Sequence, residues 1–420
     1  MTSTVRLSDL CDLVTQQVDP AQVDKRCPYL GLEHLASGRL RAVGQGQAAD
    51  VQSHKFLYQA GDVLYGKLRP YLDKAVLAET PGVCTTELLV LRAREGVDAR
   101  FLGCVVHAPD FIDHAMSGVT GAHHPRTSWA QIADFELPRF NAAQQRVVAG
   151  LLWHVQDLLD SCEQSEVVAQ QLKRAAMREI FARGLRGASQ KETEFGPVPE
   201  TWGIHPLETI AFVQTGVAKG RKLNPAEAID VPYLRVANVQ DGHLDLREIK
   251  NIRIRSSEIE RYLLREGDVV LTEGGDFDKL GRGFIWRDEV AQCIHQNHVF
   301  AVRVNRERLL PEFLAYVAQS TYGRAYFLKV AHKTTNLACI NTTKLKAFPV
   351  LVPDTTEQGE IVAILEAVDH QIDLHKKKSV VLQHIFKALL RKLMSGEMSV
   401  DGQRLFALEG VNSASKVIAA

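Results

Sequence analysis

The sequence has no excess of either charge, and its cysteines show no pattern typical of disulfides or of a metal site. Its 420 residues contain 50 Lys and Arg and 50 Asp and Glu, so a nucleic-acid partner would have to be held by local basic clusters. The seven cysteines are scattered and never form a C-x-x-C pair, which argues against disulfides and zinc. No apolar run approaches the ~20 residues that cross a bilayer, and no basic region precedes an apolar run at the N-terminus. A cytoplasmic protein is expected.

Signatures of catalysis are also missing. The sequence has no Asn/Asp-Pro-Pro-aromatic motif for amino methylation, no G-x-x-x-x-G-K-[ST] phosphate loop and no H-E-x-x-H zinc motif. The glycines between residues 274 and 283 do not follow the G-x-G-x-x-G spacing of dinucleotide sites. Pro109-Asp110 and Pro353-Asp354 could begin a nuclease motif, but no acidic-x-Lys triplet follows either. We therefore expect no catalytic, cofactor or metal site in this chain.

What the sequence does contain is an internal repeat. Three short motifs recur in the same order, at offsets of 204, 206 and 212 residues: Pro28-Tyr29-Leu30 with Pro232-Tyr233-Leu234, Gly61-Asp62-Val63 with Gly267-Asp268-Val269, and Phe101-Leu102 with Phe313-Leu314. Slowly growing offsets are expected when loops are inserted between matching points of two copies. The chain is predicted to hold two similar domains, called here the first and second heads.

Each copy ends in a long helical pattern. Asn141-x-x-Gln144 and Thr355-x-x-Gln358 resemble capping boxes, and Gly184 and Gly396 suit the left-handed ends of two helices. About 40 residues at 1.5 Å each give helices of roughly 55 to 60 Å. The apolar residues of the second helix keep a four-three spacing interrupted by His375 and Ser379: Ile361, Leu365, Val368, Ile372, Leu382, Phe386, Leu389 and Leu393.

The first long helix carries a less regular apolar stripe. Val148, Leu152, Val155 and Leu159 begin it, and Leu172, Ala176 and Ile180 continue it after a polar stretch. Each stripe could pack on its own head, or the two helices could pack on each other with polar positions fixing the register. The connector from Gly184 to Trp202 is too short for a parallel return, so a pair would be antiparallel, with the heads at opposite ends.

Both heads are predicted to be α+β domains. Short strands are expected at residues 62–68 and 84–91 in the first head and at 268–272, 283–286 and 298–304 in the second. Amphipathic helices are expected at residues 100–116 and 311–330. Tyr71, Phe277 and Trp286 are predicted to be core residues rather than stacking platforms.

Polar segments with basic residues, all but one of them containing glycine, are the candidate DNA contacts. Residues 65–74 and 121–128 form two in the first head, and residues 216–222, 273–283 and 332–336 form three in the second. Each could be a solvated turn, but their recurrence in both heads favours contact with phosphates and guanine edges. Residues 295–298 could also reach bases, although they lead into a strand. The candidate DNA-binding residues are Lys67, Arg69, Lys74, His123, His124, Arg126, Lys219, Arg221, Lys222, Lys279, Arg282, Lys333, Thr334 and Asn336.

Two heads that each precede a long helix resemble the specificity subunits of type I restriction-modification systems. The resemblance covers about residues 6 to 396 and is carried by residues 61–72, residues 267–271, the stretch 196–202 and Pro353-x-x-x-Glu357-Gln358-x-x-Ile361-Val362. It implies two tandem α+β target recognition domains, with the two helices packed as an antiparallel coiled coil. The first head lacks the Pro-x-x-Trp entry of the second. The implied division is residues 1–139, first head; 140–186, first long helix; 187–202, linker; 203–352, second head; 353–396, second long helix; and 397–420, a tail without an assigned role.

The resemblance also implies how such a chain would act. Each head would read one half of a split double-stranded DNA target, and the helices would set the gap, with roughly 55 Å spanning about 16 base pairs. Two modification subunits would bring S-adenosylmethionine and methylate adenine, and motor-nuclease subunits would use ATP and Mg²⁺ in defence against phage. None of those cofactors would bind to this chain.

Two other classes of function remain open from the sequence. The chain could be a fused DNA methyltransferase or nuclease whose motif has diverged, which purified protein would reveal by turnover. It could also be a coiled-coil scaffold without a DNA role, an idea that the zero net charge permits. Salt-dependent affinity for DNA would exclude the scaffold.

Overall fold

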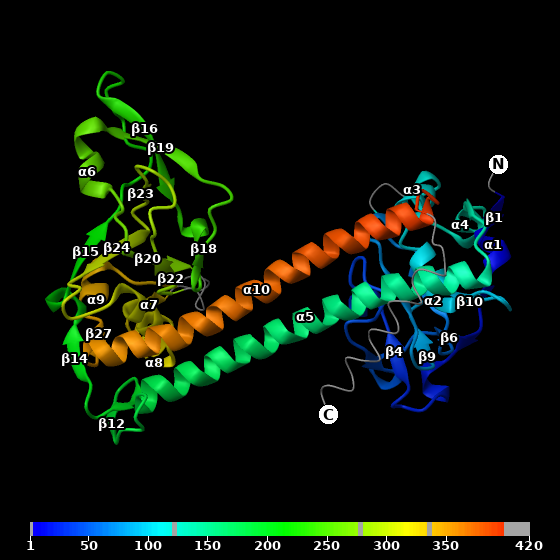
Figure 1. Cartoon of the computed structure of the whole chain (residues 1–420), viewed down its shortest axis with the longest axis horizontal. Coiled ribbons are helices and arrows are strands. Elements are labelled where there is room, and N and C mark those ends of the chain that lie inside the picture. Colours follow the sequence, from blue (N-terminus) through cyan, green and yellow to red (C-terminus); the bar gives the residue numbers. More distant parts are fainter. Residues whose placement is uncertain (1–2, 120–123, 276–279, 334–337, 399–420) are drawn as a thin grey trace. The chain divides into compact units, whose positions relative to one another are not determined.

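The computed structural model describes residues 3–119, 124–275, 280–333 and 338–398 (Figure 1). The chain forms two compact units, residues 1–165 with 375–420 and residues 166–374. Each unit contains one head and part of both long helices. Each head combines sheets with short helices, so the predicted α+β class is confirmed.

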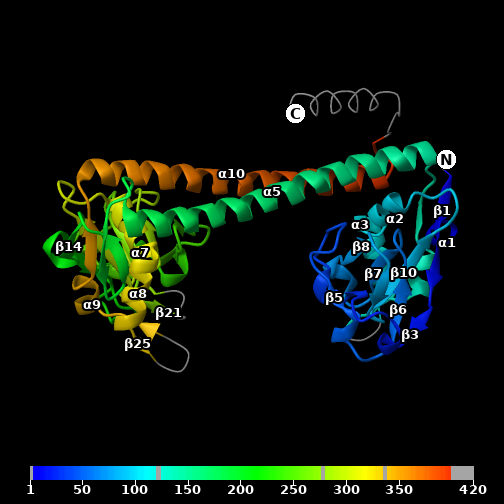
Figure 2. The same ribbon diagram turned by 90° about the horizontal axis from the view of Figure 1, so that it is seen from below.

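The first head is built around a four-stranded antiparallel sheet in the order β2-β10-β7-β8, joined to a five-stranded sheet in the order β3-β6-β9-β4-β5. Helix α2 lies against β7, β8 and β10 (Figure 2). The bounds are β1 (Thr4–Arg6), α1 (Leu7–Leu10), β2 (Cys11–Val14), β3 (Gln17–Val18), β4 (Pro28–Leu30), β5 (Gly46–Gln47), β6 (Lys55–Tyr58), β7 (Val63–Gly66), β8 (Ala75–Leu77), β9 (Gly82–Cys84), β10 (Leu88–Ala93), α2 (Ala99–Val105), α3 (Pro109–Ser117), α4 (Trp129–Ala133) and β11 (Glu136–Pro138).

The second head repeats this plan. Its four-stranded sheet has the order β15-β24-β20-β22, and helix α7 lies against β20 and β22. The bounds are β14 (Gly203–Pro206), β15 (Ala211–Thr215), β16 (Ala228–Leu234), β17 (Val239–Gln240), β18 (His243–Leu244), β19 (Lys250–Arg255), α6 (Ile259–Tyr262), β20 (Val269–Thr272), β21 (Gly274–Gly275), β22 (Gly283–Ile285), β23 (Ile294–His295), β24 (Val299–Val304), α7 (Pro311–Gln319), α8 (Thr321–Val330), β25 (His332–Lys333), β26 (Ala338–Cys339), α9 (Thr342–Lys346) and β27 (Pro349–Val352).

The repeated sequence motifs occupy matching places in the two heads. The Pro-Tyr-Leu motifs lie in β4 and β16, and each of these strands has a parallel partner, β9 or β23. The Phe-Leu motifs lie in α2 and α7, where all four side chains are buried. The duplication inferred from short sequence matches is therefore a duplication of structure.

Each Gly-Asp-Val motif places a buried carboxylate under an arginine of the neighbouring strand. Asp62 pairs with Arg92 through contacts of 2.8 and 2.7 Å, and Asp268 pairs with Arg303 through contacts of 2.8 and 2.6 Å. Each aspartate also accepts a backbone N–H from the preceding turn. Asp62 is 2% exposed and Asp268 is 1% exposed, so each carboxylate depends on these partners in place of water. The glycine before each aspartate has a positive φ, 89° and 87°, which favours glycine at that turn.

The two helices predicted in the heads are each broken into two, so both predictions are wrong in this respect. Within residues 100–116, α2 ends at Val105 and α3 begins at Pro109, because proline lacks an N–H and suits a first helical turn. Within residues 311–330, Ser320 is extended (φ −64°, ψ 163°) and its hydroxyl accepts the Gly323 N–H at 3.2 Å. Ser320 thus ends α7 and caps α8.

The long helices are α5 (Ala142–Arg183) and α10 (Thr355–Met394). At α5 the predicted capping box is confirmed, since Asn141 and Gln144 exchange two bonds of 2.9 Å between side chain and backbone. At α10 the predicted cap on Thr355 is wrong: Asp354 caps the helix by accepting the Glu357 N–H at 2.9 Å. Gly184 and Gly396 end the helices with positive φ, as predicted.

A buried glutamine follows each helix cap and defines how the two copies align. The side-chain amides of Gln145 and Gln358 donate to the carbonyls of Phe140 and Pro353. Their oxygens accept the N–H groups of Asp98 and Leu310, ahead of α2 and α7. The residue equivalent to Gln358 is therefore Gln145, whereas the sequence comparison aligned it with Gln144.

Helices α5 and α10 pack on each other in an antiparallel sense. Within the second unit Lys173 of α5 lies 2.7 Å from Asp369 of α10. The Leu185 N–H donates to Glu357 Oε1 at 3.0 Å. Leu185 follows Lys173 by twelve residues, and Glu357 precedes Asp369 by twelve. As the numbering rises on one side it falls on the other, which confirms the predicted antiparallel pair (Figure 1).

All the predicted seam residues except Leu172 are buried or half-buried along this pair. In the first unit Val148, Leu152, Val155 and Leu159 of α5 share a cluster with Phe386, Leu390 and Leu393 of α10, with Leu382 and Leu389 against its margin. In the second unit Ile361 and Leu365 pack with Met177, Ile180 and Phe181, while Ile372 is buried and Val368 is half-buried. Leu172 was wrongly placed on the seam: it is 57% exposed, because its neighbour Lys173 faces the partner helix.

Charged groups attach the first head to its part of α5. Arg39 pairs with Asp160 and Glu163, and Arg41 pairs with Asp157 at 2.7 Å and with Asp160 at 3.1 Å. Leu40, between the two arginines, is 1% exposed within the head core. The loop that carries them therefore contacts both the core of the head and the long helix.

Candidate nucleic-acid interface

The structure brings together the two candidate DNA-binding segments of the first head, although about 50 residues separate them. Leu68 and Arg126 form an isolated antiparallel bridge. The Arg69 N–H donates to the Pro125 carbonyl at 2.7 Å, and the Thr127 N–H donates to the Lys67 carbonyl at 3.0 Å. Two stretches chosen independently from the sequence thus form one surface.

The basic residues of this surface differ in how they are held. The Lys74 ammonium donates to the Leu32 carbonyl at 2.6 Å, so it supports the loop. Arg126 pairs with Glu87 at 3.1 Å while remaining 45% exposed. Lys67 and Arg69 are half-buried. The bonds made by Lys74 and Arg126 would compete with a DNA phosphate for these cations.

In the second head a strand outside the candidate segments, β26, joins two of them. Strand β26 pairs with β21 and β25, which places Cys339 opposite both Gly274 and His332. A Cβ on Gly274 would lie 2.5 Å from the Ala338 carbonyl oxygen, so the close approach of β21 to β26 requires glycine. Among the candidates here, Lys333 is exposed and Arg282 is half-buried.

The glycine-containing segment 216–222 lies against residues 295–297. The Val217 N–H donates to the His295 carbonyl at 2.9 Å, and the Asn297 N–H donates to the Val217 carbonyl at 2.9 Å. Lys219 and Lys222 are exposed, with the Lys219 ammonium 5.6 Å from the ring of Tyr233.

Arg221 of the same segment is held within the head. It makes two contacts of 2.8 and 2.9 Å with Glu258, and this bond keeps the pKa of the Glu258 carboxyl below its usual value. Arg221 would have to leave this partner to bind a phosphate.

Four candidates lie outside the described residues: His123, Lys279, Thr334 and Asn336. His124, next to the first of them, is exposed.

His295, one of the residues for which base contact remained open, is buried. It is 0% exposed, with its Nδ1 2.6 Å from the Val299 carbonyl oxygen. His298, by contrast, is exposed at the surface and pairs with Glu273. Of these two histidines, only His298 is accessible to DNA.

Lowering the pH is expected to destabilise the second head through His295. Burial holds the pKa of this imidazole at about 4, below its usual 6.5. The unfolded chain takes up a proton at this histidine near pH 6.5, and the folded chain does so only near pH 4. The contribution of neutral His295 to the free energy of unfolding is therefore full above pH 6.5 and is lost as the pH falls toward 4. At pH 5 the loss amounts to ~2 kcal/mol. Urea denaturation at pH 7 and pH 5 should show a smaller pH effect in His295→Gln than in the wild type.

A matched control for this experiment is His243→Gln, at an exposed histidine of the same head. Its pH effect should equal that of the wild type. An unchanged pH effect in His295→Gln would contradict the assignment.

Two of the aromatic predictions can be compared with the structure. Trp286 is 0% exposed and belongs to the core, as predicted. Tyr71 is 52% exposed, so its placement in the core was wrong. Phe277 lies outside the described residues.

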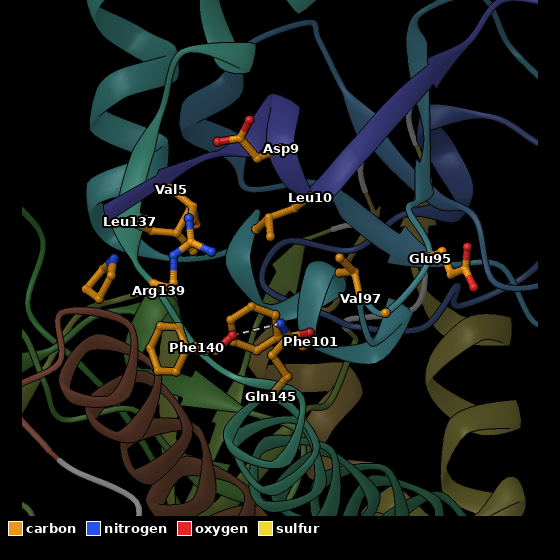
Figure 3. A pocket seen from close by; sticks show the side chains of 12 residues that line it. Val5, Asp9, Leu10, Glu95, Val97, Phe101, Leu137, Arg139, Phe140 and Gln145 are labelled. Carbon is orange, nitrogen blue, oxygen red and sulfur yellow. Dashed lines mark hydrogen bonds between the residues drawn. The ribbon is translucent and has the colours of Figure 1, made fainter. Parts of the chain in front are cut away.

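A pocket of about 210 Å³ lies in the first head, away from the candidate DNA-binding segments (Figure 3). It is lined by β1, α1, β11 and the start of α2 and α5, and it carries Asp9, Glu95 and Arg139 beside apolar Leu10 and Phe140. Among the described residues, no cluster of three or more His, Cys, Asp and Glu side chains is arranged to hold a metal ion. No helix in the same described ranges has the length and apolar character to cross a membrane.

The fold is a duplicated α+β domain with a long helix after each copy. A crystal structure of a type I restriction-modification system S subunit from M. genitalium aligns with a TM-score of 0.57 and 13% identity, covering 96% of this chain and 97% of that one. This likeness shows the fold.

Sequence comparison finds one family model and several relatives similar to this chain. Residues 199–384 match the family model described as the Type I restriction modification DNA specificity domain. The MjaVIII specificity subunit of Methanocaldococcus jannaschii is 22% identical over 94% of this chain and 92% of its own length. The MjaX specificity subunit of the same archaeon is 26% identical over 49% of this chain, and the match spans about half of that relative, 48%. The predicted resemblance to type I restriction enzyme specificity subunits is confirmed.

Proposed function

We propose that this chain is the DNA-specificity subunit of a type I restriction-modification complex. Each head reads one half of a split DNA target, and the α5–α10 pair sets the gap between the halves and docks the methyltransferase subunits. The observation that carries the proposal is that two heads of one design each bring together candidate segments that lie far apart in the sequence. Residues 67–69 pair with 125–127 in the first head, and residues 274–275 and 332–333 both pair with 338–339 in the second.

The contrast between scaffold and surface supports two unlike half-sites. The scaffold is repeated closely, down to the buried pairs Asp62–Arg92 and Asp268–Arg303. The joined segments are not repeated. The first head has Lys67, Leu68 and Arg69 in its segment, whereas the second head has Gly274 and Gly275 at the matching place. Repeated supports with different contact residues suit a target whose two halves differ in sequence.

The same proposal makes the chain non-catalytic. S-adenosylmethionine would bind to two modification subunits that methylate adenine, and ATP and Mg²⁺ would bind to restriction subunits. This chain contributes the choice of site, because its basic segments can contact phosphates and base edges.

The proposal is tested by expressing the chain with a type I methyltransferase subunit and mapping methylated adenines in the host DNA. Methylation at a split sequence of two specified halves and a fixed gap is expected. The purified chain alone, given labelled S-adenosylmethionine and DNA, should transfer no methyl group. Turnover by the chain alone, or methylation of one unbroken sequence by the complex, would overturn the proposal.

A further inference from the structure

A short turn in the first head has an unusual backbone. Residues Pro70 to Leu72 form a single 3₁₀ turn between Arg69 (φ 52°, ψ 68°) and Asp73 (φ 50°, ψ 55°). Both flanking residues are left-handed, although neither is glycine. Such residues cost of order 1 kcal/mol or more each and persist where surrounding contacts impose them.

The contacts that impose this backbone are present on both sides of the turn. The Arg69 N–H donates to the Pro125 carbonyl at 2.7 Å, and the Asp73 carbonyl accepts the Gly38 N–H at 2.8 Å. Asp73 Oδ1 lies 2.6 Å from Nδ1 of His107, a residue that is 3% exposed. The turn is therefore anchored to the core of the head at its end and to the second DNA-binding segment at its start.

The anchored turn presents apolar side chains to solvent. Tyr71 is 52% exposed and Leu72 is 36% exposed, while Pro70 between them and Arg69 is buried. Within the described residues the Tyr71 hydroxyl makes no hydrogen bond, and folding gains little from its ring. A rigid exposed aromatic beside Lys67, Arg69 and Arg126 is placed to meet a base once the cations have met the phosphates.

We propose that Tyr71, supported by Leu72, contacts a base of the half-site that the first head reads. This inference rests on the proposed function and names a residue that determines its specificity. The ring can stack on a base exposed at a distorted step or pack against a thymine methyl, and neither contact requires the hydroxyl. Asp73 and His107 act as positioning residues that hold the turn.

The test compares Tyr71→Ala and Tyr71→Phe in the complex with a methyltransferase subunit. Once the wild-type target has been mapped, affinity is measured on that duplex and on duplexes with single changes in each half. Tyr71→Ala should bind the target roughly tenfold more weakly and tolerate changes at one position of the first half-site. Tyr71→Phe should retain wild-type affinity and selectivity.

Phe212→Ala provides the matched control, since Phe212 is an exposed aromatic, 63%, on the edge strand of the second head. It should leave recognition of the first half-site unchanged. Wild-type recognition by Tyr71→Ala, or weaker assembly with the methyltransferase subunit at unchanged selectivity, would overturn the inference. Failure of the proposed function looks different, because the wild-type complex itself would then show no split target.

Discussion

Replacing Asp268 with alanine is expected to destabilise the second head by about 3 kcal/mol, because it leaves the Arg303 guanidinium and a turn N–H without their carboxylate. Arg303 is 32% exposed, so solvent recovers part of its charge and the loss stays at the lower end for a broken buried pair. Asp62→Ala should have a similar effect on the first head, where Arg92 is 39% exposed. Urea denaturation at pH 7 measures both losses.

The control for these substitutions is Asp12→Ala, at an exposed pair with Arg94. Surface pairs contribute less than about 1 kcal/mol, so its stability should hardly change. Losses confined to one of the two aspartate variants would show that the duplicated pairs do not play equivalent roles.

Lengthening both long helices is expected to widen the gap in the DNA target without changing either half. Seven residues inserted between Ser165 and Glu166 and seven between Leu374 and His375 keep the heptad phase of each helix. They add about 10 Å to the pair at 1.5 Å per residue, which corresponds to about three base pairs. Mapping methylated adenines with the altered chain reads the new gap directly.

Insertion in α5 alone provides the comparison, because it shifts its seam residues out of register with those of α10 and should reduce the yield of active complex. A gap that stays the same after the double insertion would mean that the helices do not set the spacing.

Much of the fold could be predicted because its signals repeat along the chain. The four-three spacing from Ile361 to Leu393 indicated a helix seam, and the recurrence of Gly-Asp-Val indicated two heads of one design. The direction of helix packing followed from the short connector, which forms the hairpin of β12 (Gln190–Thr193) and β13 (Gly196–Pro199). Such features depend on local periodicity and chain length, which a sequence displays directly.

Other features depended on contacts between distant residues and were missed. The helix break at Ser320 follows from its hydroxyl bond to Gly323, which an amphipathic pattern does not reveal. The equivalence of Gln145 with Gln358 rests on hydrogen bonds to residues about 50 positions away. Nothing local distinguishes Gln144 from Gln145.

The candidate DNA interface shows the same division. Its segments could be chosen by composition, but their convergence depends on pairings such as Leu68 with Arg126. Tyr71 was assigned to the core because aromatic residues are usually buried, whereas two left-handed neighbours turn it outward. The signal that could have found it is its position between Arg69-Pro70 and Asp73-Lys74, a turn with a basic residue on each side.

The central claim is tested most directly by exchanging residues 1–139 for the first head of a specificity subunit whose target is known, and mapping the methylated adenines. The chimaera should methylate a target in which one half is the donor's, while the other half remains that of the present chain. If both halves change together, or the target stays as it was, the two heads do not read DNA independently and the account is contradicted.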